Sequence, residues 1–359
     1  MRRPLREPDP SHTWLATNAE LRGILARLDT GLALENAEEY VGSFSRIVPF
    51  TDRQGAKKIL KVRARWMTER RVAFEHALAK HLADAGLPMP VPIPFEGGGT
   101  WQKAGGFFCE VRPLVEGREA RPVAREVCLM GLLLGAFHRH SREFDASGYE
   151  PPEVQNQVEP QELQSELDIL RQLEANPGLA GPGYFDTLWT RWGEAKAYLA
   201  ERAASLPQLV RHGDFHEWNV LFSSQEPARV AALLDLDMAA IGPRIYDVGY
   251  AILMFRLLFL GGSVEDWRGL YCEFLWGYAE ASNMPIEDSE AQVAAYLMEC
   301  IAIRFLVHRL KWAHTTDRVN EEYRQEYLEV VNWLDRFKGE LAEMLREAGG
   351  RRHRGRSHR

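Results

Sequence analysis

The chain has 359 residues and a formal net charge of −7 at pH 7, with 45% hydrophobic and 26% charged residues. These values are typical of a globular protein with one large or two ordinary domains, and they exclude a general electrostatic attraction to nucleic acid or membranes. The four cysteines have no paired spacing for zinc or a redox motif. The basic N-terminus lacks a following apolar segment, and the most apolar window, 250–260, is about half of a membrane span. We therefore expect a cytoplasmic protein that binds neither membranes nor nucleic acid.

The N-terminal part of the chain has the pattern of a small antiparallel sheet. Five strands are predicted from short apolar segments bounded by turns, at 32–41, 46–51, 58–62 and twice within 101–115. Apolar residues at every fourth position predict a helix over 68–85, which Gly86 ends. Residues 1–30 are expected to form an N-terminal extension with a short helix that ends at Leu28.

Beyond Gly117 the sequence pattern is mainly helical. Helices are predicted at 124–144, 159–173, 184–204, 247–260, 264–283, 289–312 and 320–347, and two short strands interrupt them. The whole pattern predicts an α+β fold. Its parts are a five-stranded N-terminal domain with one helix, over 31–115, and a larger helical domain, over 116–347. The Arg-rich residues 348–359 are expected to be a disordered, solvated tail.

One polar segment carries most of the chemical information. Residues 212–219 read HGDFHEWN, with Asp214 and Asn219 five positions apart, and an apolar segment follows at once. A second apolar segment, from Val230 to Leu234, ends in Asp235-Leu236-Asp237. Phosphoryl transfer needs one carboxylate to accept the proton of the attacking hydroxyl, and an amide and a second carboxylate to hold magnesium. The spacing therefore predicts transfer of a phosphoryl group from a nucleotide to a hydroxyl.

Each residue of this set also has an ordinary structural interpretation. Asp214 beside Gly213 is the candidate general base, whereas an isolated Asp is more often a turn residue or helix N-cap. Asn219 and Asp235 are the candidate magnesium ligands. Strand periodicity points Asp237 the same way as Asp235, in a supporting position. Asp247, at the start of a predicted helix, is interpreted from the sequence alone as an N-cap.

The two histidines of the segment and the following tryptophan are candidate supporting or substrate residues. His212 is expected to bond the loop backbone, and His216 to orient Asp214 or contact the substrate. Trp218 is bulky and directly precedes Asn219, so we expect it to shape the acceptor pocket.

The N-terminal domain supplies candidates for nucleotide binding. Lys61 lies in an apolar strand, where a lysine either faces solvent or holds phosphates when a helical carboxylate pairs with it. Glu75 is the expected partner and Glu69 the alternative. The turn that contains Gly42 and Ser43 can lay backbone N–H groups over phosphates, although it lacks a full G-x-G-x-x-G pattern.

Three segments together resemble one known family. They are His212-Gly213-Asp214-x-His216-x-x-Asn219, Leu234-Asp235-Leu236-Asp237 and Gly242-Pro243-x-x-x-Asp247. They resemble the aminoglycoside phosphotransferase and choline kinase superfamily, and look closest to its bacterial stress response kinase branch, with homoserine kinases as relatives. The similarity covers about 32–340, and includes Gly135-x-x-His138 in the first large-domain helix.

The resemblance implies a bilobal protein-kinase-like fold and a role for each motif residue. Asp214 is then the catalytic base, Asn219 and Asp235 bind Mg²⁺, and Asp247 braces the catalytic loop. Lys61, held by Glu75, contacts the nucleotide phosphates, and backbone groups near Arg112 and Leu114 bind the adenine of ATP. The incomplete loop at Gly42-Ser43 leaves GTP open as an alternative nucleotide.

Other classes of protein share parts of the pattern. Asp235-Leu236-Asp237 after an apolar strand is also found in haloacid dehalogenases, but there it begins an α/β domain, whereas helices follow it here. The segment at 212–216 is similar to a metallophosphatase fragment, but the accompanying Gly-Asn-His element is missing from the sequence. A kinase-like fold without catalysis is the third alternative, against which the intact set of Lys61, Asp214, Asn219 and Asp235 argues.

The acceptor is expected to be a hydroxyl of a small molecule. Candidates are an aminoglycoside, a nucleoside antibiotic, an amino alcohol or a homoserine-like compound, and a protein Ser or Thr is the alternative. We expect the protein to act as a monomer or homodimer.

Overall fold

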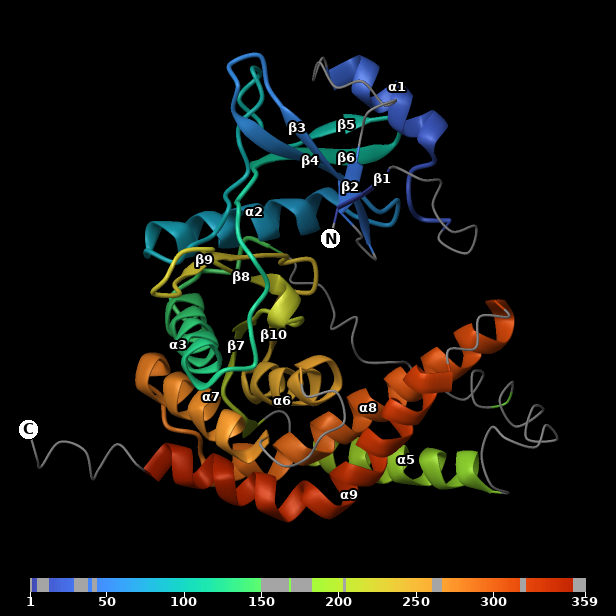
Figure 1. The fold of residues 1–359 in the computed structure, drawn as a ribbon, viewed down its shortest axis with the longest axis vertical. Coiled ribbons are helices and arrows are strands. Elements are labelled where there is room, and N and C mark those ends of the chain that lie inside the picture. The colour runs from blue at the N-terminus through green and yellow to red at the C-terminus, as the bar shows by residue number, and fades with distance from the viewer. Residues whose placement is uncertain are drawn as a thin grey trace, which may run out of the picture. The chain divides into compact units, whose positions relative to one another are not determined.

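The computed structural model describes residues 2–4, 13–28, 38–40, 44–149, 168, 183–202, 205–259, 267–316 and 321–350. The chain divides into two compact units (Figure 1). The first unit consists of Met1–Arg118, Phe144–Pro152 and Ala231–Asp237, and the second of Glu119–Glu143, Glu153–Val230 and Met238–Arg359. The acidic motif at 235–237 therefore belongs to the first unit, although it lies far along the chain from the rest of it.

The first unit contains an antiparallel sheet of six strands. In spatial order these are β1 (Arg2–Pro4), β2 (Glu38–Tyr40), β3 (Ser45–Thr51), β4 (Lys57–Arg63), β6 (Phe107–Pro113) and β5 (Gln102–Ala104). A strand lies in each of the five predicted segments, but the count of five is wrong because β1 adds a sixth. The sequence gives no sign of β1, since a three-residue edge strand is too short to show a hydrophobic period.

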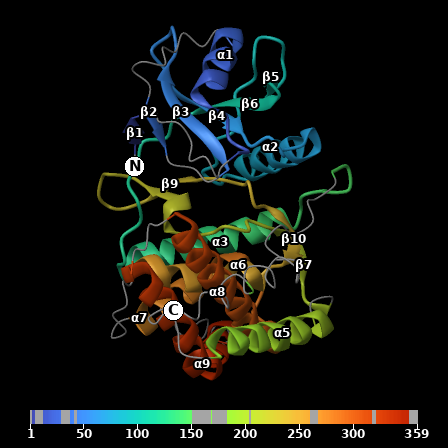
Figure 2. The ribbon, with the colours of Figure 1, turned by 90° about the vertical axis from the view of Figure 1, so that its right-hand side faces the viewer.

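The two faces of this sheet carry different side chains. Leu60 and Val62 of β4 lie in one apolar cluster with Leu21 and Ile24 of helix α1 (Asn18–Leu28). Side chains alternate along a strand, so Lys61 and Arg63 lie on the opposite face. Figures 1 and 2 show the sheet between α1 and helix α2 (Glu69–Asp84). The helix predicted for the N-terminal extension is thus part of the core of the first unit. Among the described residues, two helices, α1 and α2, pack on the sheet, whereas only α2 was predicted to do so.

Local signals at both ends explain where α2 begins and ends. The Thr68 hydroxyl caps its N-terminus by accepting a hydrogen bond from the Arg71 N–H at 3.2 Å. Gly86 has a φ of +91°, a conformation that favours glycine, and ends the helix as predicted.

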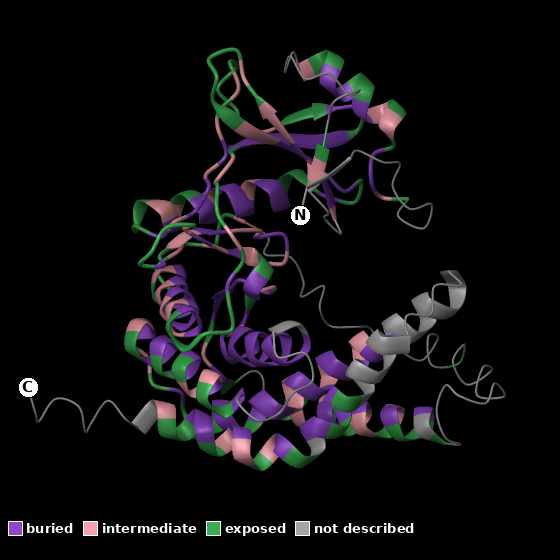
Figure 3. Ribbon diagram, in the orientation of Figure 1, coloured by how far each residue is buried: buried purple, intermediate pink, exposed green. Residues whose placement is uncertain are grey.

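The second unit is mainly helical, as the sequence predicts. Its helices are α3 (Ala124–Ser141), α5 (Tyr184–Arg202), α6 (Ile245–Met254), α7 (Trp267–Ser282), α8 (Asp288–Thr316) and α9 (Glu321–Gly350). A π-helical segment, Phe255–Phe259, extends α6. Every residue of α6 is buried, as Figure 3 shows. The helix predicted at 159–173 lies outside the described residues except for Asp168, which is helical. In the described part of the chain, no helix is both long and apolar enough to cross a membrane.

Short strands flank the loop at 212–219. Strand β7 (Gln208–Arg211) pairs antiparallel with β10 (Ala240–Pro243), which the sequence did not predict. Strand β8 (Val220–Phe222) follows the loop, and β9 (Val230–Leu233) leads into the acidic motif.

Candidate active site

The backbone of the loop at 212–219 is fixed by a glycine and a short helical turn. Gly213 has a φ of +83°, and a Cβ at this position would lie 2.0 Å from the carbonyl oxygen of Met238. Only glycine fits there. Residues Glu217–Asn219 form a 3-10 turn, and His216 Nδ1 caps it by accepting a hydrogen bond from the Trp218 N–H at 3.2 Å. This geometry presents the side chains of Asp214 and Asn219 from one rigid loop.

Three side chains hold the carboxylate of Asp214. The Tyr250 hydroxyl donates to Oδ1, the Asn219 amide nitrogen donates to Oδ2 at 3.2 Å, and His216 Nε2 lies 3.4 Å from Oδ2. Burial raises the pKa of Asp214, but the hydrogen bonds and charge of its neighbours, His216 first, outweigh burial and leave the pKa below its usual range. The side chain is still 30% exposed. Asp214 is therefore an ionised carboxylate that a ligand can reach.

Among the residues that the structure describes, the side-chain amide of Asn219 makes its hydrogen bonds through its nitrogen and not through its oxygen. Its nitrogen donates to both the backbone and the side chain of Asp214, and lies 3.1 Å from His216 Nε2. Within the described residues, no donor contacts the amide oxygen of Asn219. An uncharged oxygen held in this way is a ligand that hard divalent cations accept, so Asn219 fits the magnesium role predicted for it.

Asp247 ties the loop to two helices. Its carboxylate accepts hydrogen bonds from the backbone N–H groups of His212 at 2.6 Å and Gly213 at 2.8 Å, and it lies 2.9 Å from Nε2 of His138 on α3. Burial alone would raise the pKa of Asp247. The hydrogen bond to His138 and nearby positive charges outweigh burial, so the pKa lies below its usual value and the group is ionised. The N-cap interpretation is wrong, because the N-cap of α6 is Arg244. The contacts fit the bracing role that the resemblance implies.

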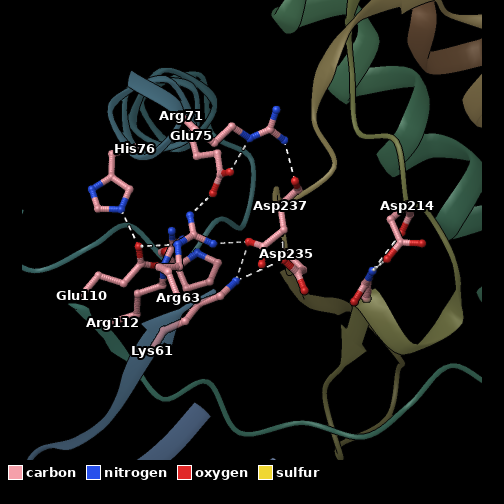
Figure 4. A network of polar contacts seen from close by, with 12 residues as sticks. Lys61, Arg63, Arg71, Glu75, His76, Glu110, Arg112, Asp214, Asp235 and Asp237 are labelled. Carbon is pink, nitrogen blue, oxygen red and sulfur yellow. Dashed lines mark hydrogen bonds and ion pairs between the residues drawn. The ribbon is translucent and has the colours of Figure 1, made fainter. Parts of the chain in front are cut away.

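Lys61 meets both aspartates of the acidic motif (Figure 4). Its ammonium lies 2.6 Å from Oδ1 of Asp237 and 3.1 Å from Oδ1 of Asp235. The two aspartates do not share a strand face as predicted, since β9 ends at Leu233. They lie in the turn that follows, where Asp235 has a φ of +60° and accepts a hydrogen bond from the Asp237 N–H at 3.2 Å.

The predicted ion pair between Lys61 and Glu75 is wrong. Glu75 is fully buried, and its two carboxylate oxygens pair with Arg63 and with Arg71, the latter at 2.7 Å (Figure 4). Arg63 was missed from the sequence. It is two residues after Lys61 on the same strand, so strand periodicity places both cations on one face and is the signal that would have found it.

The remaining predicted nucleotide residues are only partly described. Gly42 and Ser43 lie outside the described residues. The Arg112 side chain donates to Glu110 at 2.6 Å and to the Pro90 carbonyl at 2.9 Å. The Leu114 N–H donates to the carbonyl of Lys57 at 3.1 Å, so this N–H group is already engaged. Adenine binding near Arg112 and Leu114 stays a prediction.

The other residues of the loop differ sharply in exposure. Trp218 is 55% exposed, and its role in an acceptor pocket stays a prediction. His212 is buried, and its Nδ1 accepts from the Asp214 N–H at 3.3 Å, the backbone contact predicted for it. The buried carboxylate of Glu217 has no hydrogen-bond partner among the described residues, and burial raises its pKa to about 7. Within the described part of the chain, no three His, Cys, Asp or Glu side chains gather around a point that a metal ion would occupy.

The two-unit α+β architecture and the loop at 212–219 together define a protein-kinase-like phosphotransferase. A family model described as the phosphotransferase enzyme family matches residues 45–282, and the chain belongs to this family. A homoserine kinase from Rhizobium rhizogenes is 27% identical over 272 residues, which cover 75% of this chain and 78% of the relative.

Two solved structures confirm the predicted fold. An amicoumacin kinase in complex with AMP-PNP and Ca²⁺ matches with a TM-score of 0.64 at 15% identity, over 87% of this chain and 89% of that chain. A microcompartment-associated aminopropanol kinase matches with a TM-score of 0.63 at 14% identity, over 91% of this chain and all of the other. The particular likeness to stress response kinases stays a prediction.

Proposed function

We propose that this phosphotransferase moves the γ-phosphoryl group of ATP to a hydroxyl of a small molecule, with Mg²⁺ as cofactor and Asp214 as catalytic base. The observation that carries the proposal is the state of Asp214. Its carboxylate is ionised, reachable and fixed by three side chains on a braced loop. Such a group can orient an acceptor hydroxyl and accept its proton during attack on the phosphorus.

The other motif residues take complementary roles in the proposal. Lys61 binds the phosphates of the nucleotide with its buried ammonium. Asn219 and Asp235 would hold the magnesium ion, since one offers an amide oxygen and the other a carboxylate that is 34% exposed. Bound there, the ion neutralises charge on the phosphates. Asp247 keeps the loop in place through its bonds to the backbone of His212 and Gly213.

We propose a small hydroxyl-bearing amine as the acceptor class. The relative at 27% identity is a homoserine kinase, and an aminopropanol kinase shares the fold. Both names describe acceptors with an amine near the hydroxyl. Hydroxyl-bearing antibiotics belong to the same proposal, with aminoglycosides and nucleoside antibiotics as candidates, because an amicoumacin kinase also shares the fold.

An acceptor screen tests the proposal. Purified full-length protein is incubated with Mg²⁺ and either ATP or GTP, in the presence of pooled homoserine analogues, amino alcohols, aminoglycosides, nucleosides or casein. We expect ATP-dependent phosphorylation in one small-molecule pool and its loss on chelation of Mg²⁺. Phosphorylation of casein alone identifies a protein kinase of the stress response type instead. No transfer to any pool and no ATP hydrolysis contradict the proposal.

A pair of variants tests the role of the base. Asp214→Ala is expected to abolish turnover while Mg²⁺–nucleotide still binds. The control is Asp84→Asn, which changes an exposed aspartate at the end of α2 and is expected to leave turnover unchanged. Normal turnover in Asp214→Ala contradicts the assignment of the base.

A further inference from the structure

The charged groups on the α2 face of the sheet form one buried network. Strand register explains its origin, because Lys61 of β4 lies opposite Glu110 of β6 and Ile59 lies opposite Arg112. Among the described residues this network joins His76, through its contact with Glu110, to four basic and four acidic side chains (Figure 4): Lys61, Arg63, Arg71 and Arg112, and Asp235, Asp237, Glu75 and Glu110. Equal numbers of each sign allow so many charges to be buried together.

Glu75 is fully occupied within this network. Arg63 and Arg71 each pair with one of its two carboxylate oxygens, and the carboxylate and the Arg63 side chain are completely buried. A third cation at Glu75 would leave excess positive charge in a site closed to water, which is costly. Glu75 is thus saturated by guanidinium groups, and Lys61 has its carboxylate partners elsewhere.

The carboxylate of Asp237 contacts both Lys61 and Arg63. Its Oδ1 pairs with the ammonium of Lys61 at 2.6 Å and with the guanidinium of Arg63. Its backbone carbonyl accepts a hydrogen bond from Arg71 of α2. The side chain is only 3% exposed, whereas that of Asp235, the other partner of Lys61, is 34% exposed. Asp237 is therefore the buried anchor of Lys61, and Arg63 connects this anchor to Glu75.

We propose that Asp237, and not Glu75, positions Lys61 for the nucleotide phosphates, and that Arg63 fixes Asp237 by joining it to Glu75 on α2. The inference rests on the proposed function to the extent that Lys61 is taken to contact the nucleotide. Asp235, the other partner of Lys61, is the more exposed of the two carboxylates and is the one proposed to hold the cation.

A double-mutant cycle decides between the two carboxylates. The dissociation constant of Mg²⁺–AMP-PNP is measured for the full chain and for Lys61→Ala, Asp237→Asn, Glu75→Gln and the two double variants that contain Lys61→Ala. We expect Asp237→Asn to raise the dissociation constant about tenfold in the otherwise wild-type chain. In the Lys61→Ala background the same substitution is expected to raise it less than about twofold, which would show that the two residues are coupled. Glu75→Gln is expected to show clearly smaller coupling to Lys61. The proposal is overturned if the coupling energy between Glu75 and Lys61 equals or exceeds that between Asp237 and Lys61.

Matched variants separate positioning from general damage. Arg46→Lys alters another buried arginine of the same sheet, which pairs with Glu39 at 2.7 Å outside the network. It is expected to lower the melting temperature without changing nucleotide affinity. Arg63→Lys keeps the charge but loses the forked contact, and is expected to weaken nucleotide binding about threefold or more. Unchanged affinity in Arg63→Lys contradicts the role of Arg63, and this variant serves if Asp237→Asn does not fold.

The same cycle measured by urea unfolding makes the test independent of the nucleotide. Coupling between Lys61 and Asp237 in the free energy of unfolding supports the pairing, and its absence overturns it. If the wild-type protein binds no Mg²⁺–nucleotide at all, the proposed function fails, while the unfolding cycle still decides which carboxylate holds Lys61.

Discussion

The hydroxyl of Tyr250 donates a hydrogen bond to Oδ1 of Asp214, so that helix α6 contacts the candidate base directly. Asn219 and His216 contact the other carboxylate oxygen, Oδ2. The phenol therefore fixes the orientation of the carboxylate that we propose to receive the acceptor hydroxyl. Tyr250 follows Asp247 by one helical turn, and α6 thereby both braces the loop backbone and orients its carboxylate.

Removal of this hydroxyl is the first test of the arrangement. Tyr250→Phe is expected to lower kcat roughly tenfold, since a hydrogen bond to a charged group contributes about 1.5 kcal/mol. The KM for ATP is expected to stay nearly constant, because the Tyr250 hydroxyl bonds to the candidate base. Steady-state kinetics with the acceptor found in the screen provide the measurement. Tyr271→Phe is the control, since that buried hydroxyl has no hydrogen-bond partner among the described residues. Equal kcat values for Tyr250→Phe and wild type contradict an orienting role.

Asp247 is expected to be essential for the folded loop. Asp247→Ala leaves the N–H groups of His212 and Gly213 buried without their acceptor. We expect a loss of about 3–5 kcal/mol in the free energy of unfolding, the usual cost of removing one partner from a buried charged contact. Urea unfolding followed by circular dichroism measures it. Asp84→Asn, on the exposed end of α2, is expected to change stability little. A loss below about 1 kcal/mol in Asp247→Ala means that the loop does not depend on this brace.

The ionisation of Asp247 also predicts a pH dependence of stability. Its pKa in the folded protein is lowered from the ordinary value of 3.8. The folded state thus favours the ionised form, and its stabilising contribution is present above pH 3.8 and is lost as pH falls toward the folded pKa. The difference in unfolding free energy between wild type and Asp247→Asn is expected to shrink as the pH falls below about 4. A difference that grows on acidification contradicts this sign.

The sequence predicts those features that depend on residues close together in the chain. The motif at 212–219 spans a single loop and short helical turn, so its spacing alone indicates that Asp214 and Asn219 meet. The helix α2 was predicted for the same reason, from a local hydrophobic period and a glycine. Neither prediction requires knowledge of how distant segments pack.

Features that depend on distant segments were predicted less well. Lys61 and Arg63 lie on the same face of β4, and the sequence does not say which of them reaches the carboxylate of α2. The position of Asp237 decides it, and that residue reaches the network from a segment more than 170 positions away. Strand β10 was missed because its pairing with β7 joins segments about thirty positions apart, which no local pattern shows.

The crossing of α3 and α7 gives a last prediction, about stability. A Cβ on Gly131 would lie 2.0 Å from the Phe274 carbonyl oxygen, and one on Gly277 would lie 2.3 Å from that of Cys128. Backbone atoms cannot yield as a flexible side chain would, so Gly131→Ala must push the two helices apart. We expect it to lower the free energy of unfolding by about 3 kcal/mol or more.

A second glycine in a helix provides the matched control for this substitution. Gly193 lies within α5, and a Cβ there meets nothing within 4 Å. Gly193→Ala is expected to raise stability by up to about 1 kcal/mol, because alanine has the higher helix propensity. Urea unfolding of both variants measures the two effects under the same conditions. Similar small changes in both would mean that α3 and α7 do not approach as closely as the glycines allow, whereas opposite signs confirm that the helix crossing depends on Gly131.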